Sequence, residues 1–292
     1  MTSVRIPYKT NDGKSTFFET DSASTEVSIE VDAASIDLKP ISALKGIEDL
    51  TISSTWLEHL DLSPLSSVAK QLKTVSLRWS HLTELNLQPL ATCKALERLE
   101  LANNVLTQID LKPLASCASL NSLGIAENRL QGIDLTPLGS CKKLVKLNLS
   151  GNPLTKIDLA PLKTCTLLEV VFLGGVGLQS LALTPLSSCK SLKILNLANN
   201  ELQSIDLSPL GKVSSFEEID LLGNKIATID LGPLKSCPKL TKVNLASNKL
   251  KQIDLAPLES CAELQSVDVS GNQISNLVIP AALQRPTCRI LR

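Results

Sequence analysis

Aromatic residues and histidines are scarce in this chain of 292 residues. Aromatic side chains make up 2% of it, as two tryptophans, one tyrosine and four phenylalanines. So few rings exclude a stacking platform for nucleic-acid bases. Only His59 and His81 are present, which excludes a metal site built from several histidines and leaves few candidates for a general base. We therefore expect no catalytic residue, no metal site and no cofactor.

Charge of one sign and long apolar runs are also lacking. The chain has 29 Lys and Arg residues against 29 Asp and Glu residues, a formal net charge of 0. A phosphate-binding surface needs clustered positive charge, so neither nucleic acid nor a membrane surface is expected as a partner. No apolar run reaches the roughly 18 to 20 residues of a membrane-spanning helix, and the first residues lack the apolar stretch of a secretory signal. We expect a soluble chain.

What the sequence does contain is an internal repeat. Cys93 and Cys117 stand 24 residues apart, and the same spacing continues along the chain, with Val213 in one place where a cysteine would fall. Prolines keep the same spacing, with one longer step between Pro64 and Pro89. Repeats of this length predict a solenoid in which each copy buries its apolar face against its neighbours. The cysteines are Cys93, Cys117, Cys141, Cys165, Cys189, Cys237 and Cys261, and the prolines are Pro40, Pro64, Pro89, Pro113, Pro137, Pro161, Pro185, Pro209, Pro233 and Pro257.

One copy, residues 96–119, shows the expected local structure. Leu99 and Leu101 alternate with polar or small residues, which is typical of a short strand with one buried face. Ile109 and Leu111 alternate in the same way, so a second extended piece with inward-facing side chains is expected. A proline then begins about one helical turn, because proline suits the first turn of a helix and cannot continue a sheet.

The segments LERLELANNVL, LVKLNLSGNPL and LKILNLANNEL match the pattern LxxLxLxxNxL, and in this the chain resembles the leucine-rich-repeat family over about residues 36 to 276. The resemblance implies an α/β fold: a right-handed solenoid, or horseshoe, of about ten repeats. It further implies a parallel sheet on the concave side, short helical turns or 3-10 segments on the convex side, and a β cap at the N-terminus. Members of the family mainly bind proteins. The IDLxPLxxCxxL half resembles a variant of intracellular and microbial members.

Two polar columns repeat with the leucines. The asparagines are expected to bond backbone groups at the turn, and each aspartate is expected to accept the backbone amide two residues on, as Asp110 would from Lys112. Stacked carboxylates could also suggest calcium binding, the alternative we weigh against this structural role. The columns are Asn104, Asn128, Asn152, Asn200, Asn224, Asn248 and Asn272, and Asp61, Asp110, Asp134, Asp158, Asp206, Asp230 and Asp254.

The cysteines are interpreted as buried free thiols. No CxxC or Cys/His spacing exists, and each cysteine of the register stands where a leucine would also fit. Regular buried thiols favour a reducing compartment, so we expect a cytoplasmic protein. Cys288 lies outside the register, and we expect it to be exposed and the most reactive thiol.

Both ends depart from the repeat. Residues 1–35 are expected to form a capping hairpin and strand, residues 36–275 ten leucine-rich repeats, and residues 276–292 a C-terminal cap carrying Arg285, Arg289 and Arg292, all within one structural domain.

Two clusters break the small polar pattern expected on the concave face. In the first, Trp79, Arg78 and His81 lie in one copy, with Trp56 before them and Arg98 and Glu100 after them. Trp56 and His81 share a column, so neighbouring strands about 4.8 Å apart would make them neighbours. Exposed Trp and Arg are favoured at protein interfaces. The alternative is that the tryptophans pack against the N-terminal cap.

In the second cluster, Val170, Phe172 and Ile194 replace polar residues, and Leu222 extends the patch. The same copy has Val176 and Ala182 in the asparagine and aspartate columns, and drift in one degenerate repeat is the alternative. The sequence as a whole predicts a non-enzymatic module, monomeric, that binds a protein partner on its concave face. Left open are a regulator of a partner enzyme, resembling family members that activate small GTPases or control a phosphatase, and a ligand-sensing fragment of a larger receptor.

Overall fold

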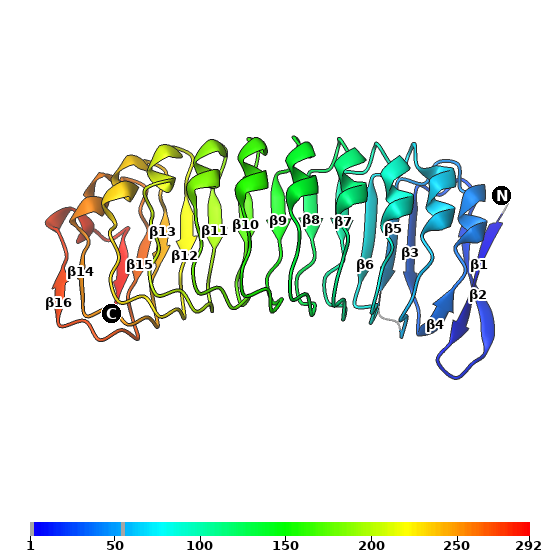
Figure 1. Ribbon diagram of the computed structural model, residues 1–292, viewed down its shortest axis with the longest axis horizontal. Helices are drawn as coiled ribbons and strands as arrows, with labels where there is room; N and C mark the ends of the chain where they lie inside the picture. Colours follow the sequence, from blue (N-terminus) through cyan, green and yellow to red (C-terminus); the bar gives the residue numbers. More distant parts are fainter. Residues whose placement is uncertain (1–2, 54–55) are drawn as a thin grey trace. The chain divides into compact units, whose positions relative to one another are not determined.

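The computed structural model describes residues 3–53 and 56–292, so two residues of the predicted N-terminal cap lie outside the described residues. The chain divides into two compact units, unit 1 within residues 1–144 and unit 2 within residues 145–292. Inside each unit, short parallel strands stand side by side and short 3-10 helices (η) form a second row (Figure 1). The expected parallel sheet with 3-10 turns is confirmed. None of the described helices has the length and apolar character that crossing a membrane requires.

Unit 1 begins with a hairpin and continues as a parallel sheet. β1 (Ser3–Thr10) pairs antiparallel with β2 (Ser15–Asp21) and with β4 (Ala33–Ile36). β3 (Glu26–Glu30) instead joins the repeat strands by pairing in parallel with β5. The further strands are β5 (Asp49–Ser53), β6 (Thr74–Arg78), β7 (Arg98–Glu100) and β8 (Ser122–Gly124), and the helices are η1 (Lys39–Ala43), η2 (Ser63–Val68), η3 (Gln88–Thr92), η4 (Lys112–Ser116) and η5 (Thr136–Ser140).

Unit 2 continues the alternation of short strands and 3-10 helices. Its last two strands lie within residues 276–292, the segment predicted as the C-terminal cap. Its parallel sheet comprises β9 (Lys146–Asn148), β10 (Val170–Phe172), β11 (Ile194–Asn196), β12 (Glu218–Asp220), β13 (Lys242–Asn244), β15 (Ser266–Asp268) and β17 (Arg289–Leu291). A second parallel pair is β14 (Gln252–Asp254) with β16 (Asn276–Val278). The helices are η6 (Ala160–Thr164), η7 (Thr184–Ser188), η8 (Leu210–Lys212), η9 (Gly232–Ser236), η10 (Ala256–Ser260) and η11 (Ala281–Leu283).

The leucines of the strands form the core. Leu99 and Leu101 are fully buried, and Leu99 pairs directly with Leu123 of the next strand, so equivalent apolar side chains stack from copy to copy. Burying each such side chain contributes about 1.5–3 kcal/mol. Ile109 differs from the expectation: it is half-exposed, whereas Leu111 is buried. The second extended piece therefore turns only one of its two aliphatic residues fully inward.

The asparagine column bonds backbone groups at the turn, as expected, and in doing so it also joins neighbouring copies. In Asn104, Nδ2 donates to the carbonyls of Leu77 at 2.7 Å and Leu101 at 3.0 Å, and Oδ1 accepts from the amides of Ser80 at 3.1 Å and Leu82 at 3.0 Å. These bonds satisfy buried backbone groups that the turn leaves unpaired. Nδ2 donates to two such carbonyls also in Asn128, Asn200, Asn224, Asn248 and Asn272.

The aspartate column has the predicted turn role. The amide of Lys112, the first residue of η4, donates to Oδ1 of Asp110 at 2.9 Å, and Pro113 follows in the same helical turn. A hydroxyl two residues on adds a second donor in some copies: the Ser63 hydroxyl and amide lower the pKa of Asp61, and those of Thr136 lower the pKa of Asp134. These carboxylates thus accept hydrogen bonds from local donors, as a turn role requires.

The thiols of the cysteine column are buried, free and weakly bonded. The Cys117 thiol donates to the carbonyl of Leu90 at 3.4 Å, and burial raises its pKa to about 12. Burial likewise raises the pKa of Cys237 to about 11. The expectation for Cys288 was wrong: its exposed fraction is 7%, because the chain returns to the sheet as β17 immediately after it.

Candidate functional site

The aromatic cluster consists of Trp56, Trp79 and His81. Trp79 is 60% exposed and Trp56 54% exposed, the largest exposed fractions among the large apolar side chains described. All three residues lie in the turns that follow β5 and β6, not on the strands themselves. The rings of Trp56 and His81 stack, with centroids 5.1 Å apart and planes 17° apart, so these two residues are neighbours as predicted. Both tryptophans are more than half exposed, and Trp56 lines a hollow that it shares with Asn11 and Ser35 of the N-terminal cap.

The backbone under this cluster is left-handed. Trp79 has φ 59° and His81 φ 58°, a region that disfavours bulky side chains by about 1–2 kcal/mol per residue. The amide of Trp79 donates to the carbonyl of Ala102 at 3.2 Å, which holds the conformation in place. The eighth position of every described copy is left-handed, and elsewhere small or turn-forming residues occupy it, with one further exception at Glu127. The column is Trp79, Asn103, Glu127, Gly151, Gly175, Asn199, Gly223, Ser247 and Gly271.

Two hollows flank His81. The Trp79 hollow has a volume of about 400 Å³ and is lined by Trp79, His81, Asn103, Asn104, Val105 and Glu127. The second hollow, of about 650 Å³, reaches the hairpin, and its lining includes Asn11, Ser35, Trp56 and Arg129. Glu127 and Asn103 were not among the candidates from sequence. The signal for them was present, because glycine and asparagine dominate the eighth position, and Trp79 and Glu127 depart from that pattern.

The strand face of unit 1 carries Arg78, Arg98 and Glu100, three of the predicted residues. Arg78 and Arg98 are exposed, whereas Glu100 is half-buried and accepts a hydrogen bond from the Ser122 hydroxyl at 3.3 Å. The Glu100 carboxylate occupies the space above Gly124, where an added Cβ would collide with it. Glu100 is therefore held in place by its neighbours, while the two arginines are exposed.

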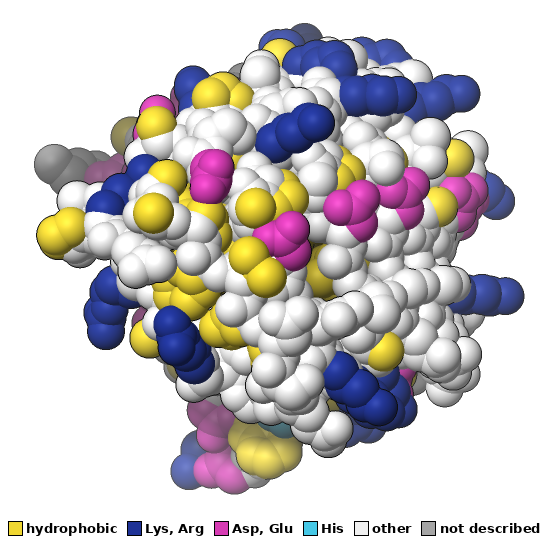
Figure 2. Space-filling view, turned by 90° about the vertical axis from the view of Figure 1, so that its left-hand side faces the viewer, with side chains coloured by type: hydrophobic (Ala, Val, Ile, Leu, Met, Phe, Trp, Pro, Cys, Tyr) yellow, Lys and Arg dark blue, Asp and Glu magenta, His cyan; other side chains and the backbone are white. Residues whose placement is uncertain are grey.

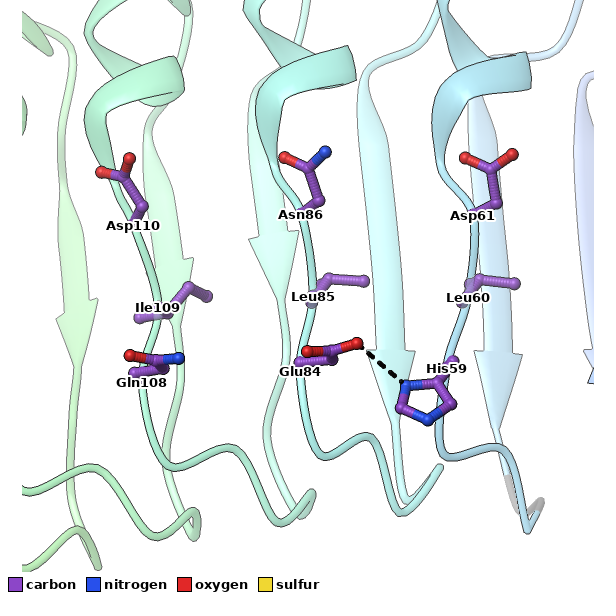
Figure 3. Close-up of a pocket in the computed structure, with 9 residues that line it drawn as sticks. All are labelled: His59, Leu60, Asp61, Glu84, Leu85, Asn86, Gln108, Ile109 and Asp110. Carbon is purple, nitrogen blue, oxygen red and sulfur yellow. Dashed lines mark ion pairs between the residues drawn. The ribbon is translucent and has the colours of Figure 1, made fainter.

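A groove of about 640 Å³ lies along the second extended pieces of unit 1. In Figure 3, His59 points toward Glu84, and their ion pair spans 3.3 Å between Nδ1 and Oε1. Asp61 and Asp110 point instead toward the 3-10 helices of their own copies, each accepting a backbone amide. Because both partners of the ion pair are mostly exposed, the pair contributes little to stability. Within residues 3–53 and 56–292, no three His, Cys, Asp or Glu side chains are grouped to hold a metal ion.

Unit 2 brings together three of the four predicted apolar residues. Val170 pairs directly with Ile194, and Phe172 is on the same face of β10 as Val170. The ammonium of Lys146 lies 5.8 Å from the Phe172 ring centroid. Leu222 follows β12, two strands from Phe172, and so extends the patch without adjoining its ring. All four side chains are half-exposed.

Val176 changes the loop of the preceding copy in unit 2. In other copies the asparagine accepts an amide from that loop, as Asn128 does from Leu106 at 3.1 Å. Val176 has no such acceptor, and the amide of Leu154 donates to the Asn152 carbonyl at 2.8 Å, while Thr155 adopts φ 56°. The missing asparagine therefore reshapes a turn beside the apolar patch.

The C-terminal end of unit 2 presents a sheet edge. This end of Figure 1, with β16 and β17, faces the viewer in Figure 2, where apolar side chains gather among charged ones. Val278 in β16 and Leu291 in β17 are each more than 40% exposed. Arg285, expected to be solvated, instead donates through Nη2 to the carbonyls of Cys261, Ala262 and Leu264 at 3.0–3.1 Å. The Arg285 guanidinium thereby binds the backbone of the preceding copy.

Comparison with family models gave three matches. Residues 67–177 match a model described as a BspA type leucine rich repeat region, and residues 191–213 and 214–274 each match a leucine rich repeat model. Comparison with curated proteins gave no matching sequence.

Solved structures share the fold. An internalin from Listeria monocytogenes is 22% identical, with a TM-score of 0.61, and the match covers 92% of this chain and 82% of that one. A TDR receptor is 20% identical, with a TM-score of 0.74 and coverage of 91% and 52%. The plant peptide hormone receptor RGFR1 in complex with RGF2 is 20% identical, with a TM-score of 0.65 and coverage of 82% and 45%. This chain thus spans about half the length of the two receptor chains.

Proposed function

Because this chain belongs to the leucine-rich-repeat family, whose members are protein-interaction modules, we propose that it binds a protein partner on the exposed face of its parallel strands and the adjoining turns. The observation that carries the proposal is Trp79, an exposed tryptophan on left-handed backbone that the fold does not require. Strain retained at an exposed ring is characteristic of functional positions. The peptide hormone receptor with its bound ligand supports a protein or peptide as the class of partner.

Each unit offers one set of anchors for this partner. Unit 1 presents Trp79 beside Arg78 and Arg98, residue types that dominate the binding energy of protein interfaces. Unit 2 presents Val170, Phe172 and Ile194, an apolar group bordered by Lys146. Neither set has an evident role in the core, because all of these side chains are at least partly exposed.

The test is affinity capture from lysate of the source cell, followed by mass spectrometry and calorimetry with the recovered partner. Trp79→Asn removes the ring while placing a residue that tolerates the left-handed backbone, and Phe172→Ser removes the ring in unit 2. The control is Leu167→Ser, an exposed apolar residue away from the strands. We expect one partner to be lost with Trp79→Asn or Phe172→Ser and kept with the control.

Capture that is equal for all three variants, with folding verified by circular dichroism, contradicts binding through this face. Loss with the control alone moves the interface to the turns behind the sheet. Once the partner is identified, its turnover with and without the chain distinguishes a scaffold from a regulator of an enzyme.

The proposal includes a monomer in a reducing, cytoplasmic compartment. It is supported by the eight free, buried cysteines of the described residues, seven of them in one register. Titration of thiols in denaturant should find eight free thiols in protein from the source cell, and light scattering should give the 31.3 kDa of one chain. Disulfides in that material would contradict the compartment.

A further inference from the structure

The Trp79 hollow combines an aromatic face with a carboxylate. Trp79 stands at one side and Glu127 at the other, with Asn103 between them in the same column of neighbouring copies. Adjacent strands lie about 4.8 Å apart, so the backbones of Trp79 and Glu127 are separated by roughly 10 Å. No lysine or arginine lines the hollow, and Glu127 has no ion pair among the described residues.

The backbone conformation at Trp79 and Glu127 indicates that the fold does not require these two side chains. Trp79 and Glu127 have φ 59° and 52°, while Gly, Asn and Ser occupy the other places of this left-handed column. The conformation is imposed by bonds between copies, such as the one from the Asn103 amide to the Ala126 carbonyl at 3.0 Å. A tryptophan and a glutamate therefore add strain that asparagine or glycine would relieve. Such outliers on either side of one hollow point to a ligand.

We propose that the Trp79 hollow binds a cationic side chain of the protein partner, with arginine preferred to lysine. A guanidinium can stack on the Trp79 ring and donate two hydrogen bonds to the Glu127 carboxylate, and the hollow of about 400 Å³ that both residues line with Asn103 has room for a planar group. An ammonium can use the ring or the carboxylate but lacks the planar fork. The Asn103 amide oxygen offers a further acceptor at the same hollow. This inference rests on the proposed binding function and names the chemistry of one of its anchors.

The test uses the whole chain and three short probes: Ac-Gly-Arg-Gly-NH₂, its lysine counterpart and its citrulline counterpart. Citrulline keeps the shape of arginine and lacks its charge. The chain has two tryptophans, so its ¹H–¹⁵N spectrum contains two indole signals, assigned with Trp56→Phe and Trp79→Phe. We expect a saturable shift of the Trp79 signal with arginine, with a dissociation constant on the order of 1 mM, weaker binding of lysine and none of citrulline.

Two variants test the carboxylate. Glu127→Gln and Glu127→Asn should each weaken arginine binding about tenfold, and the asparagine variant also suits the left-handed backbone. The control Glu259→Gln, in η10 of unit 2, should leave the titration unchanged. Raising the salt concentration should weaken binding, because both charges are close to solvent.

Equal binding of citrulline and arginine overturns the proposal, as does no saturable shift of the Trp79 signal, or an unchanged arginine affinity in both Glu127 variants. These failures differ from failure of the proposed function. If the probes fail but Trp79→Asn still loses the captured partner, Trp79 is an apolar anchor and only the cation site is wrong. If the probes bind but no partner depends on the strand face, the hollow is a cation site outside a protein interface.

Discussion

The copy at residues 72–95 and the copy at residues 240–263 have equivalent buried strand residues and differ in the turn that follows them. Val75 and Leu77 are buried in the first, Val243 and Leu245 in the second, and in both copies a proline lies in the first turn of the 3-10 helix. The later copy has Ser247, Asn248 and Lys249 in its turn, with Asn248 bonded to the carbonyls of Leu221 and Leu245. The earlier copy has Trp79, Ser80 and His81 in the same three places.

In this turn the first and third residues are exposed in both copies, whereas the middle residue, Ser80 or Asn248, is buried. The Ser80 hydroxyl reaches the carbonyls of Arg78 at 3.2 Å and Ile52 at 3.5 Å, a smaller set of bonds than asparagine makes. The turn then has two left-handed residues, Trp79 and His81, where the later copy has only Ser247. A change in the turn therefore alters which side chains the copy exposes to solvent, while the strand residues of its core stay buried.

The largest expected effect is the same in both copies. Leu77 and Leu245 are fully buried, so Leu77→Ala and Leu245→Ala should each lower the free energy of unfolding by about 2–5 kcal/mol through lost burial and the cavity left behind. Chemical denaturation measures both. A much smaller loss for Leu77→Ala would show that the irregular turn also loosens its core.

The next largest effect is expected when the later copy receives the serine that the earlier copy has at the middle of its turn. Asn248→Ser should cost about 1–3 kcal/mol, because serine is too short to bond both the Leu221 and Leu245 carbonyls and leaves one buried without a donor. Chemical denaturation again measures the change in the free energy of unfolding. A loss near zero would mean that water replaces the amide, and that the asparagine column is not needed for stability.

Both copies should lose stability at alkaline pH. Burial raises the pKa of Cys93 and Cys261 above the ordinary value of 9.0, so the unfolded chain loses these protons first, and stability falls as pH rises past 9.0. Cys93→Val and Cys261→Val, which introduce the residue that Val213 already supplies at this place of another copy, should each reduce this loss. Thermal unfolding from pH 7 to pH 10 measures it; a pH dependence unchanged in both variants would place its origin elsewhere.

The smallest effect has the opposite sign. Trp79→Asn should raise the free energy of unfolding by up to about 1 kcal/mol, because asparagine tolerates left-handed backbone and the exposed ring contributes little packing. Ser247→Asn, at the same place in the regular copy, should change it by less. A stabilised variant that no longer binds its partner would tie the strain at Trp79 to function, whereas a destabilised one would show that the ring packs.

The sequence predicted the parts of this fold that repeat. The 24-residue spacing, the leucine alternation and the proline positions follow directly from packing one copy on the next, and so do the bonds of Asn104 and Asp110. The stacked pair of Trp56 and His81 was predictable for the same reason, since equal positions in neighbouring copies are neighbours in space.

What departs from the repeat was harder to predict. The burial of Cys288 and the bonds of Arg285 depend on how the chain closes its last copy, for which no second example exists in the sequence. Glu127 was missed although glycine and asparagine dominate its column in the sequence, because only the left-handed backbone explains why a glutamate there is exceptional. The half-exposure of Ile109 was not predicted because alternation indicates which side chains face inward and not how completely each is covered.

The constant separation of bonded partners has a mechanical consequence. The asparagine and thiol bonds between copies join residues 22 to 27 positions apart in the sequence, so each copy is tied to its immediate neighbour by a similar short set of bonds. Under tension applied to the two termini, an end copy can detach without breaking any link further inside. Each detachment frees about 24 residues, or roughly 80 Å of extended chain. The molecule should lengthen in equal increments, and an increment that departs from this size would locate a copy whose links differ from the rest.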